Sequence, residues 1–452
     1  MLRTHIATLT PTNQKAPRKL RFWTLVATTF FLVSGGTYGT EEIVQSPGYA
    51  LGLVILIVTP LIWSLPTALM VGELSSALPH EGGFYAWVRR ALGPFWGFQE
   101  AWLSLAASIF DMAIYPTLFV EYLSRLVPWF GEGHHGIFAG LAVIAVCAIW
   151  NLAGIHVVGW TSQWLLFLLS GPFILIVILA PLHWGELAGV SSAADPTEIS
   201  LLAGILICLW NYMGWDNAST IAREVEHPQR VYPRAMLAAV AIVTVSYVLP
   251  VLALWITGLP AANMETGAWA EVAGLLGGDW LRGFLVLCGM LSAFGMFNSL
   301  VMSYSRLPYA MALDGMAPRV FARVNAKTRV PWVSVVVLSI AWSLCLGLGF
   351  ERLITLDILL YGAALVIEFI ALVVLRVREP KLARPFRVPG GLAGAVVCGI
   401  LPTALLTFSV IQSEREEVMG INGLLFGGLI MGAGVVVYFF AHINSRANKP
   451  IA

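Results

Sequence analysis

The sequence predicts an all-α integral membrane protein with 12 transmembrane helices, arranged as a 5+5 inverted repeat with broken helices 1 and 6 and two appended helices. Only 11% of the 452 residues are charged and 58% are hydrophobic, whereas a soluble domain carries about 25% charged residues. Apolar runs long enough to cross a bilayer recur along the whole chain. Two of these runs, five spans apart, are interrupted by glycine and polar residues, which is typical of inverted-repeat transporters.

Each apolar run supplies one expected span. The expected spans cover residues 22–46, 50–78, 91–122, 136–152, 156–182, 200–221, 233–258, 277–310, 332–349, 353–377, 391–411 and 420–443. The third and eighth runs are longer than a bilayer requires, so these helices tilt or extend beyond it. The chain therefore divides into an N-terminal tail (1–21), a transport core of spans 1 to 10 (22–389), spans 11 and 12 (390–443) and a C-terminal tail (444–452).

The distribution of basic residues predicts the orientation. All but four of the 26 lysines and arginines fall in the two tails or in loops on the same side of the membrane. The four exceptions are Arg125, Arg282, Arg352 and Arg415. Because cytoplasmic loops carry the excess of lysine and arginine, we expect both tails in the cytoplasm and a multi-pass protein of the plasma or bacterial inner membrane. The chain offers no basic patch for nucleic acid.

The first interruption lies between Val33 and Glu42. Apolar residues run from Phe22 to Val33, and three glycines then fall within five positions. Glycine inside a helix costs about 1 kcal/mol relative to alanine, and backbone freed from a helix costs more in hydrocarbon. Such a break is favoured where free main chain binds a substrate. The alternative is a kink or a close helix contact through small residues.

The second interruption lies in Trp210–Ala218. An amide, a glycine and an acid separate its apolar residues: Asn211, Gly214 and Asp216. Taken alone, the segment also fits an ordinary helix whose polar residues face its neighbours. Paired breaks in corresponding halves of a chain are the strongest sequence indication of a transporter site between them.

Polar side chains share one helical face in each of three other spans. They are Glu100, Ser104, Ser108, Asp111 and Tyr115 in the third span, Ser292, Ser299 and Ser303 in the eighth, and Asp357, Tyr361 and Glu368 in the tenth. Ionisable residues at membrane depth indicate function. The alternatives are hydroxyls bonded to their own helix and, for Asp111 and Asp216, a structural pair or cap.

The position of the lysines restricts ion coupling. No lysine occurs between Lys19 and Lys327, so a proton carried within the first eight spans requires a carboxyl group. The candidates for coupling are Glu42, Asp111, Asp216 and Glu368, and for a coupled Na⁺ the hydroxyls of Ser299 and Ser303.

Several motifs resemble those of the amino acid/polyamine/organocation (APC) transporters, and within them the branch of plant polyamine uptake transporters and related bacterial permeases. The similar segments extend from about Arg21 to Pro389. They are Val33–Glu42, Glu73–Ser76 with Gly82, Gly83 and Trp87, Ala91–Glu100 with Asp111, Tyr115 and Pro116, Trp210–Asn211 with Trp215, Asp216, Ser219, Thr220, Glu224, Val225, Pro228 and Pro233, and Arg384–Pro389.

The resemblance implies a substrate site between the two broken helices. Its candidate residues are Ser34, Gly35, Gly36, Thr37 and Gly39 facing Trp210, Asn211, Gly214 and Trp215, and the polar faces add Asp111, Tyr115, Asp216 and Tyr361. Amides near Gly35 and Gly36 would bind an amino-acid carboxylate and nearby carbonyls an ammonium group. Two features depart from the family pattern. Met213-Gly214 replaces an Asn-Tyr pair of plant polyamine members, and span five has no lysine.

These observations favour a secondary active importer of an amino acid or a polyamine, coupled to H⁺. Of the two, an amino acid is favoured, because the glycine-rich break offers an anion site that a polyamine cannot use. Asp111, Asp216 and Asp357 argue for a polyamine instead, since they could bind a second amine. The alternatives are a Na⁺-coupled carrier and an exchanger; a channel or nutrient sensor fits less well. No disulfide-linked heavy chain is expected, because residues 122–135 lack cysteine. No nucleophile–base or metal constellation indicates an enzyme, and no cofactor is expected.

Overall fold

The structure, a computed structural model, describes residues 20–80, 82–154, 160–191, 201–219, 225–348, 350–412, 417–418 and 421–447. Most of the expected N-terminal tail (1–19) and the end of the C-terminal tail (448–452) lie outside these residues, as do residues 156–159 of span five and residues 200, 220 and 221 of span six. Among the described residues the fold is almost entirely α-helical. Within the described residues the only strands are β1 (Glu417–Val418) and β2 (Ile421–Asn422), which pair antiparallel.

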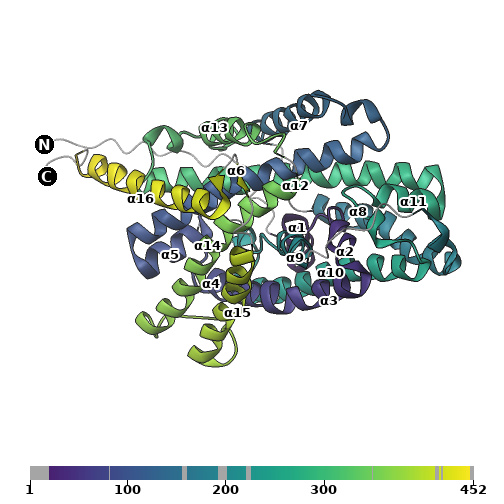
Figure 1. The fold of residues 1–452 in the computed structure, drawn as a ribbon. Helices are drawn as coiled ribbons and strands as arrows, with labels where there is room; N and C mark the ends of the chain where they lie inside the picture. Colours follow the sequence, from purple (N-terminus) through teal and green to yellow (C-terminus); the bar gives the residue numbers. More distant parts are fainter. Residues whose placement is uncertain are drawn as a thin grey trace, which may run out of the picture.

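The helices follow the apolar runs of the sequence (Figure 1). The long ones are α1 (Phe22–Val33), α3 (Gly48–Thr59), α4 (Leu65–Ala77), α5 (Gly83–Leu92), α6 (Pro94–Ser124), α7 (His135–Leu152), α8 (Trp160–Leu179), α9 (Leu201–Asn211), α10 (Pro228–Thr257), α12 (Asp279–Leu313), α13 (Trp332–Ser343), α14 (Phe350–Arg378), α15 (Gly391–Gln412) and α16 (Gly423–Ala447). Two short helices, α2 (Glu42–Gln45) and α11 (Trp269–Gly277), lie in connections. A π-helical turn, Pro60–Ser64, joins α3 and α4 into one rod.

Eight of the described helical segments are long and apolar enough to cross a membrane. They are Gly48–Ala77, Pro94–Ser124, His135–Leu152, Gln163–His183, Pro228–Thr257, Asp279–Leu313, Arg352–Arg378 and Gly391–Ile411. Three shorter apolar helices occupy the expected first, ninth and twelfth spans, and α9 occupies the sixth. The prediction of an all-α membrane protein is therefore confirmed, whereas the count of 12 spans and the inverted repeat stay predictions.

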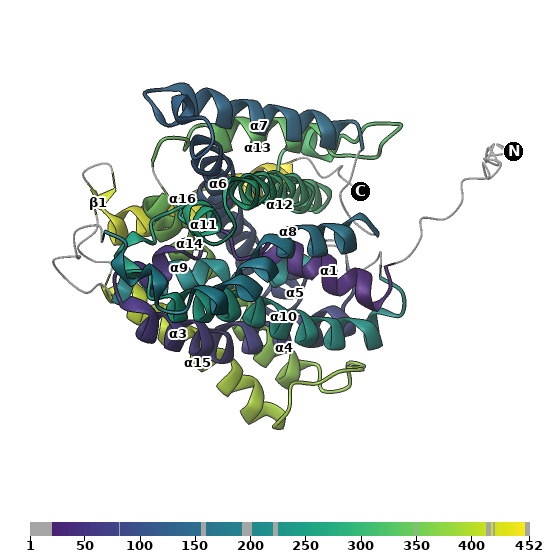
Figure 2. The same ribbon diagram turned by 90° about the vertical axis from the view of Figure 1, so that its right-hand side faces the viewer.

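The long helix α6 packs against both α12 and α14, and these contacts form the centre of the bundle. A second layer contains α1, α4 and α10, while α7 packs on α13 along one side (Figure 2). The appended helix α16 packs on α6, where the indole of Trp102 donates a hydrogen bond of 2.9 Å to the carbonyl of Ile430. In Figure 1, α5 and α11 lie at opposite ends of the molecule.

The expected start of the third span is wrong by three residues. Ala91 and Leu92 belong to α5, and α6 begins only at Pro94. Gly93 separates the two helices with φ +93°, a conformation that favours glycine. Proline is well suited to the first turn of a helix, because it needs no amide donor there.

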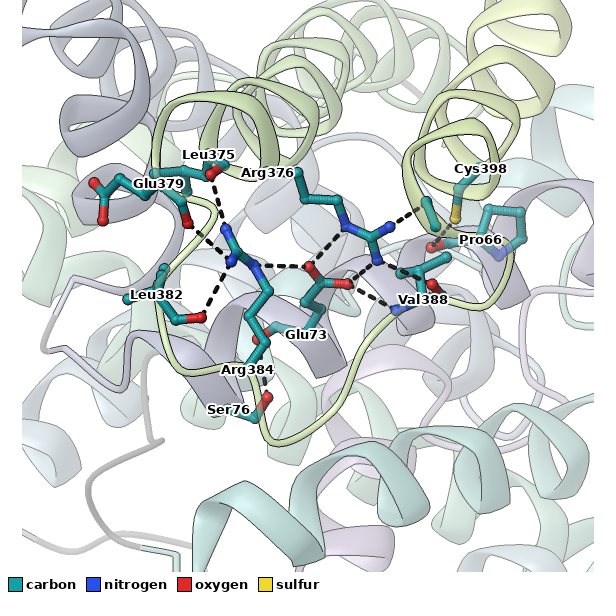
Figure 3. A network of polar contacts seen from close by, with 11 residues as sticks. Pro66, Glu73, Ser76, Leu375, Arg376, Glu379, Leu382, Arg384, Val388 and Cys398 are labelled. Carbon is teal, nitrogen blue, oxygen red and sulfur yellow. Dashed lines mark hydrogen bonds and ion pairs between the residues drawn. The ribbon is translucent and has the colours of Figure 1, made fainter.

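A buried ion cluster joins α4 to the end of α14 and to the loop that follows it (Figure 3). The carboxylate of Glu73 on α4 is fully buried and pairs with Arg376, whose Nε lies 2.9 Å from Oε1, and with Arg384, at 3.3 Å. The amide of Val388 donates a further hydrogen bond of 2.7 Å to Glu73. The guanidinium of Arg384 also donates to three carbonyls, of Leu375, Glu379 and Leu382. The Arg384–Pro389 motif thus fastens the loop after α14 to α4.

Candidate substrate-binding site

Helix α1 ends at Val33, and the backbone from Ser34 to Glu41 is not α-helical. Gly35 has φ +61°, and a Cβ built on it would lie 2.3 Å from Sδ of Met296. Only glycine fits this position, because any side chain would meet both the backbone strain and the contact. The hydroxyl of Ser292 on α12 donates a hydrogen bond of 2.7 Å to the Gly35 carbonyl, so the end of α1 is held against α12.

Helix α9 ends at Asn211, close to the end of α1. Gly214 has φ +88°, and a Cβ built on it would lie 3.2 Å from the carbonyl oxygen of Leu32. The side-chain amide of Asn211 donates a hydrogen bond of 2.9 Å to the carbonyl of Gly39. The ends of the two helices therefore contact each other directly through main chain and a single amide side chain.

The amides expected to bind a carboxylate have acceptors within the chain. The amide of Gly36 donates to the hydroxyl of Ser34 over 3.1 Å, and that of Gly35 to the carbonyl of Phe30 over 3.2 Å. In this conformation neither amide presents a free donor to a carboxylate.

A cavity of about 20 Å³ lies where the two helix ends meet α6, α12 and α14. It has room for about one water molecule, so this conformation is closed. Its lining residues are Leu32, Val33, Asp111, Tyr115, Trp210, Met213, Gly214, Asn217, Leu300, Tyr304 and Tyr361.

Asp111 is the principal polar group of the cavity. Its Oδ1 accepts hydrogen bonds from the hydroxyl of Tyr115 (3.0 Å) and the indole of Trp210 (3.3 Å). Its Oδ2 accepts one from the hydroxyl of Tyr304 (3.1 Å). These donors come from α6, α9 and α12, so one carboxylate joins three helices.

Asp216 lies beside this cavity and is joined to it through Tyr361 on α14. The Tyr361 hydroxyl donates a hydrogen bond to Oδ1 of Asp216, and it accepts one of 3.3 Å from the amide of Gly214. The interrupted segment after α9 is thus tied to α14.

Five carboxyl groups are buried in this part of the bundle, each at most 6% exposed. They are Glu100, Asp111, Asp216, Asp357 and Glu368. Within the described part of the chain, no arginine, lysine or histidine forms an ion pair with any of them. One carboxyl oxygen each of Glu100, Asp357 and Glu368 is buried without a hydrogen bond. Since an isolated charge is costly to bury, these groups require protons or a cationic ligand.

The structure brings only part of the predicted set together. Asp111, Tyr115, Trp210, Gly214 and Tyr361 line the cavity, and Asp216 adjoins it. The other predicted residues do not line it: Ser34, Gly35, Gly36, Thr37, Gly39, Asn211, Trp215, Glu42, Glu368, Ser299 and Ser303.

Several of these residues have other contacts. Gly36 and Thr37 line a separate, largely apolar pocket with α8 and α10. The indole of Trp215 donates to the carbonyl of Tyr212 over 2.7 Å. Glu42 is only half-buried and accepts a hydrogen bond from Thr266 in the connection before α11. These positions place them around the helix ends rather than in the cavity.

The alternative that the serines of α12 bond to their own helix is wrong for two of them. Ser292 donates to Gly35, and Ser303 donates to Oδ1 of Asn217 over 3.2 Å. Both serines face the interrupted segments because α12 packs beside them, so their partners are distant in sequence.

Two functional candidates were missed by the sequence reasoning. Tyr304 directly follows Ser303, and its hydroxyl reaches Asp111. Glu41, rather than Glu42, is the buried acid after the first break, with Oε1 2.5 Å from the hydroxyl of Tyr122 and 3.1 Å from the amide of Gly267. The sequence offered one indication of Tyr304, its position next to the hydroxyl-bearing face of the eighth span. Nothing in the sequence distinguishes Glu41 from Glu42.

The apolar helices and the closed, carboxylate-lined cavity define a multi-pass membrane protein with an internal polar site. A family model described as amino acid permease matches residues 25–443. The chain belongs to this family of the APC superfamily, and it is a membrane transporter and not an enzyme.

Similar proteins include both polyamine and amino acid transporters. The chain is 34% identical to the polyamine transporter PUT1 of Oryza sativa subsp. japonica, over 90% of this chain and 76% of the relative. It is 34% identical to the polyamine transporter RMV1 of Arabidopsis thaliana, over 86% of this chain and 79% of the relative. It is also 26% identical to the serine/threonine exchanger SteT of Bacillus subtilis (strain 168), over 73% of this chain and 76% of the relative.

Proposed function

We propose that the protein is a secondary active transporter that imports a polyamine, with the substrate held between the ends of α1 and α9. The observation that carries this proposal is the group of five buried carboxyl groups without an ion pair among the described residues. A polyamine carries several ammonium groups, and each needs a carboxylate or carbonyl partner when it leaves water.

Asp111 is the proposed partner of one ammonium group. It lines the cavity, and its neighbours Tyr115, Trp210 and Tyr304 offer aromatic faces that attract a cation. Asp216 and Asp357 are the proposed partners for a second ammonium group after the cavity widens. The names of the two plant relatives agree with this choice of substrate.

The amino acid remains the second candidate, because the similarity to a serine/threonine exchanger favours it. An amino acid also needs a site for its carboxylate. The amides of Gly35 and Gly36 are the proposed site, but both donate within the chain in this conformation. Binding an amino acid there requires these two hydrogen bonds to break, which favours the polyamine.

Proton coupling is proposed to use a carboxyl group of the same cluster. Asp111, Asp216 and Glu368 are the candidates, since all three are buried without an ion pair in the described residues. Glu42 is a weaker candidate, because it is half-buried away from the cavity. Na⁺ coupling through Ser299 and Ser303 is less well supported, since the Ser303 hydroxyl donates to Asn217.

The proposed transport cycle requires the 20 Å³ cavity to open toward each side in turn. The 5+5 repeat of residues 22–389 would supply this motion, with residues 390–443 as the appended helices. In this scheme both tails lie on the cytoplasmic side of the plasma or inner membrane, which the excess of lysine and arginine in the loops on that side favours.

Uptake by purified protein in liposomes tests the proposal. Labelled putrescine, alanine and lysine are compared at equal concentration, with and without an inward pH gradient, and then with a Na⁺ gradient. We expect accumulation of putrescine that depends on the pH gradient and little accumulation of alanine. Accumulation of alanine but not putrescine would favour the amino acid, and no accumulation of any substrate under any gradient would reject the proposal.

A further inference from the structure

A further pocket, of about 740 Å³, lies between α5, the end of α12 and the loop that follows it. It shares no lining residue with the substrate cavity. Four arginines and one aspartate supply the charges of its lining. We call it the arginine pocket, after Arg89, Arg90, Arg306 and Arg329.

Two of these arginines are anchored by acids. Arg89 forms an ion pair with Asp314, which also accepts a hydrogen bond of 3.0 Å from the hydroxyl of Tyr85. Arg90 binds both carboxylate oxygens of Glu379, at 2.9 and 2.7 Å. Their charges are largely compensated, and their side chains form a fixed wall of the pocket.

Arg329 differs from this pair. Its side chain is exposed and has no ion-pair partner within the described part of the chain. Its backbone is held in a tight turn, where its amide donates to the carbonyl of Asn325 over 2.9 Å and its φ is +61°. The turn therefore holds a guanidinium at the pocket that is not offset by an acid within the described residues.

The sign of this charge is opposite to that needed for a polycation. Arg89 and Arg90 are largely offset by Asp314 and Glu379, whereas the exposed guanidinium of Arg329 keeps a positive charge at the pocket, which attracts an anion and repels a polyamine. The pocket is thus unsuited to the proposed substrate. Arginine binds phosphate oxygens through two parallel N–H donors, which makes phosphate the best match among common anions.

The pocket also has an exposed apolar edge. Leu313, which lines it, is 62% exposed, and Trp332, next to the lining residue Pro331, is 41% exposed. Tryptophan concentrates at the level of lipid headgroups, and basic pockets between helices on the cytoplasmic side bind anionic headgroups. We propose that the arginine pocket binds the phosphate group of an anionic ligand at the membrane surface, with Arg329 as its principal contact.

The test uses full-length protein in detergent and native mass spectrometry. The probes are dioleoylphosphatidylglycerol, the zwitterionic dioleoylphosphatidylcholine and soluble glycerol 3-phosphate. The main variant is Arg329→Asn, because asparagine accepts a positive φ and the side chain is exposed, so folding is not at risk. Arg323→Asn is the matched control: Arg323 is exposed on the same loop and does not line the pocket.

We expect wild type to retain phosphatidylglycerol in preference to phosphatidylcholine. Arg329→Asn should weaken retention about fivefold, the size of one charge-assisted hydrogen bond, and Arg323→Asn should leave it unchanged. Displacement of the lipid by millimolar glycerol 3-phosphate would identify a soluble phosphate ester as a ligand; no displacement would identify the lipid headgroup. Equal retention of both lipids with no glycerol 3-phosphate binding, or equal losses in the two variants, would overturn the proposal.

Discussion

The hydroxyl of Tyr304 on α12 donates a hydrogen bond of 3.1 Å to Oδ2 of Asp111 on α6. This bond lies in the lining of the cavity at the helix ends and joins two of the longest helices in the bundle. It holds one oxygen of the central carboxylate, while the other oxygen accepts from Tyr115 and Trp210.

Replacing Tyr304 by phenylalanine removes this donor without changing the packing of the ring. We expect unfolding free energy to fall by about 1–2 kcal/mol, because a buried acceptor loses its partner, and the KM for putrescine to rise. Thermal unfolding in detergent and uptake in liposomes measure the two effects. Tyr309→Phe, on the same helix but outside the cavity, is the control and should change neither.

Replacing Gly35 by alanine should destabilise the protein strongly. The new Cβ would lie 2.3 Å from Sδ of Met296, at a φ of +61°. Gly48→Ala is the matched control, because Gly48 has φ +77° with nothing within 4 Å of a built Cβ. Gly48→Ala should lower the free energy of unfolding only by the backbone strain, about 1–2 kcal/mol. Gly35→Ala should lower it clearly more. Equal shifts in melting temperature would show that the end of α1 is not tightly packed on α12.

Replacing the buried Glu73 should destabilise the protein far more than replacing an exposed glutamate. Glu73→Gln leaves Arg376 and Arg384 without their shared carboxylate, and breaking a buried ion pair costs about 3–5 kcal/mol. Glu226→Gln removes an exposed pair with Arg21, which should cost at most about 1 kcal/mol. The yield of monodisperse protein and its melting temperature measure the loss of stability in each variant. Similar values for Glu73→Gln and Glu226→Gln would contradict a structural role of the cluster.

The pair of Arg90 and Glu379 predicts a small pH dependence. The hydrogen bonds from Arg90 lower the pKa of Glu379 below its ordinary value, so the folded state favours the ionised carboxylate. This contribution is present above the ordinary pKa and is lost as the pH falls through the lowered one. Because the pair is exposed, Glu379→Gln should cost at most about 1 kcal/mol at pH 7. Melting curves of Glu379→Gln and wild type should differ at pH 7 and coincide at pH 3. The same difference at both pH values would contradict the predicted pH dependence.

Composition and glycine positions predicted much of this molecule. The apolar runs predicted an all-helical membrane protein, and Gly35 and Gly214 lie where the backbone adopts positive φ after α1 and α9. The mid-span acids Asp111 and Asp216 were identifiable because ionisable groups are rare at membrane depth. Of the tyrosines that donate to them, Tyr361 was among the predicted residues, whereas Tyr304 was not, although both come from helices distant in sequence.

Other features depended on geometry that no local pattern encodes. Which of Glu41 and Glu42 turns inward is decided by the irregular backbone before α2. The start of α6 at Pro94 depends on one glycine in a positive-φ conformation. The arginine pocket joins α5 to a loop more than 200 positions later, so the sequence showed only scattered basic residues.

Binding of putrescine to purified protein, measured by isothermal titration calorimetry, tests the central claim most directly. We expect wild type and Asp111→Glu to bind putrescine, and Asp111→Asn to bind it at least tenfold more weakly, because loss of one buried ion pair exceeds about 1.4 kcal/mol. Asp314→Asn, which changes an acid outside the cavity, should bind as wild type does. Wild-type affinity for putrescine in Asp111→Asn would contradict the account.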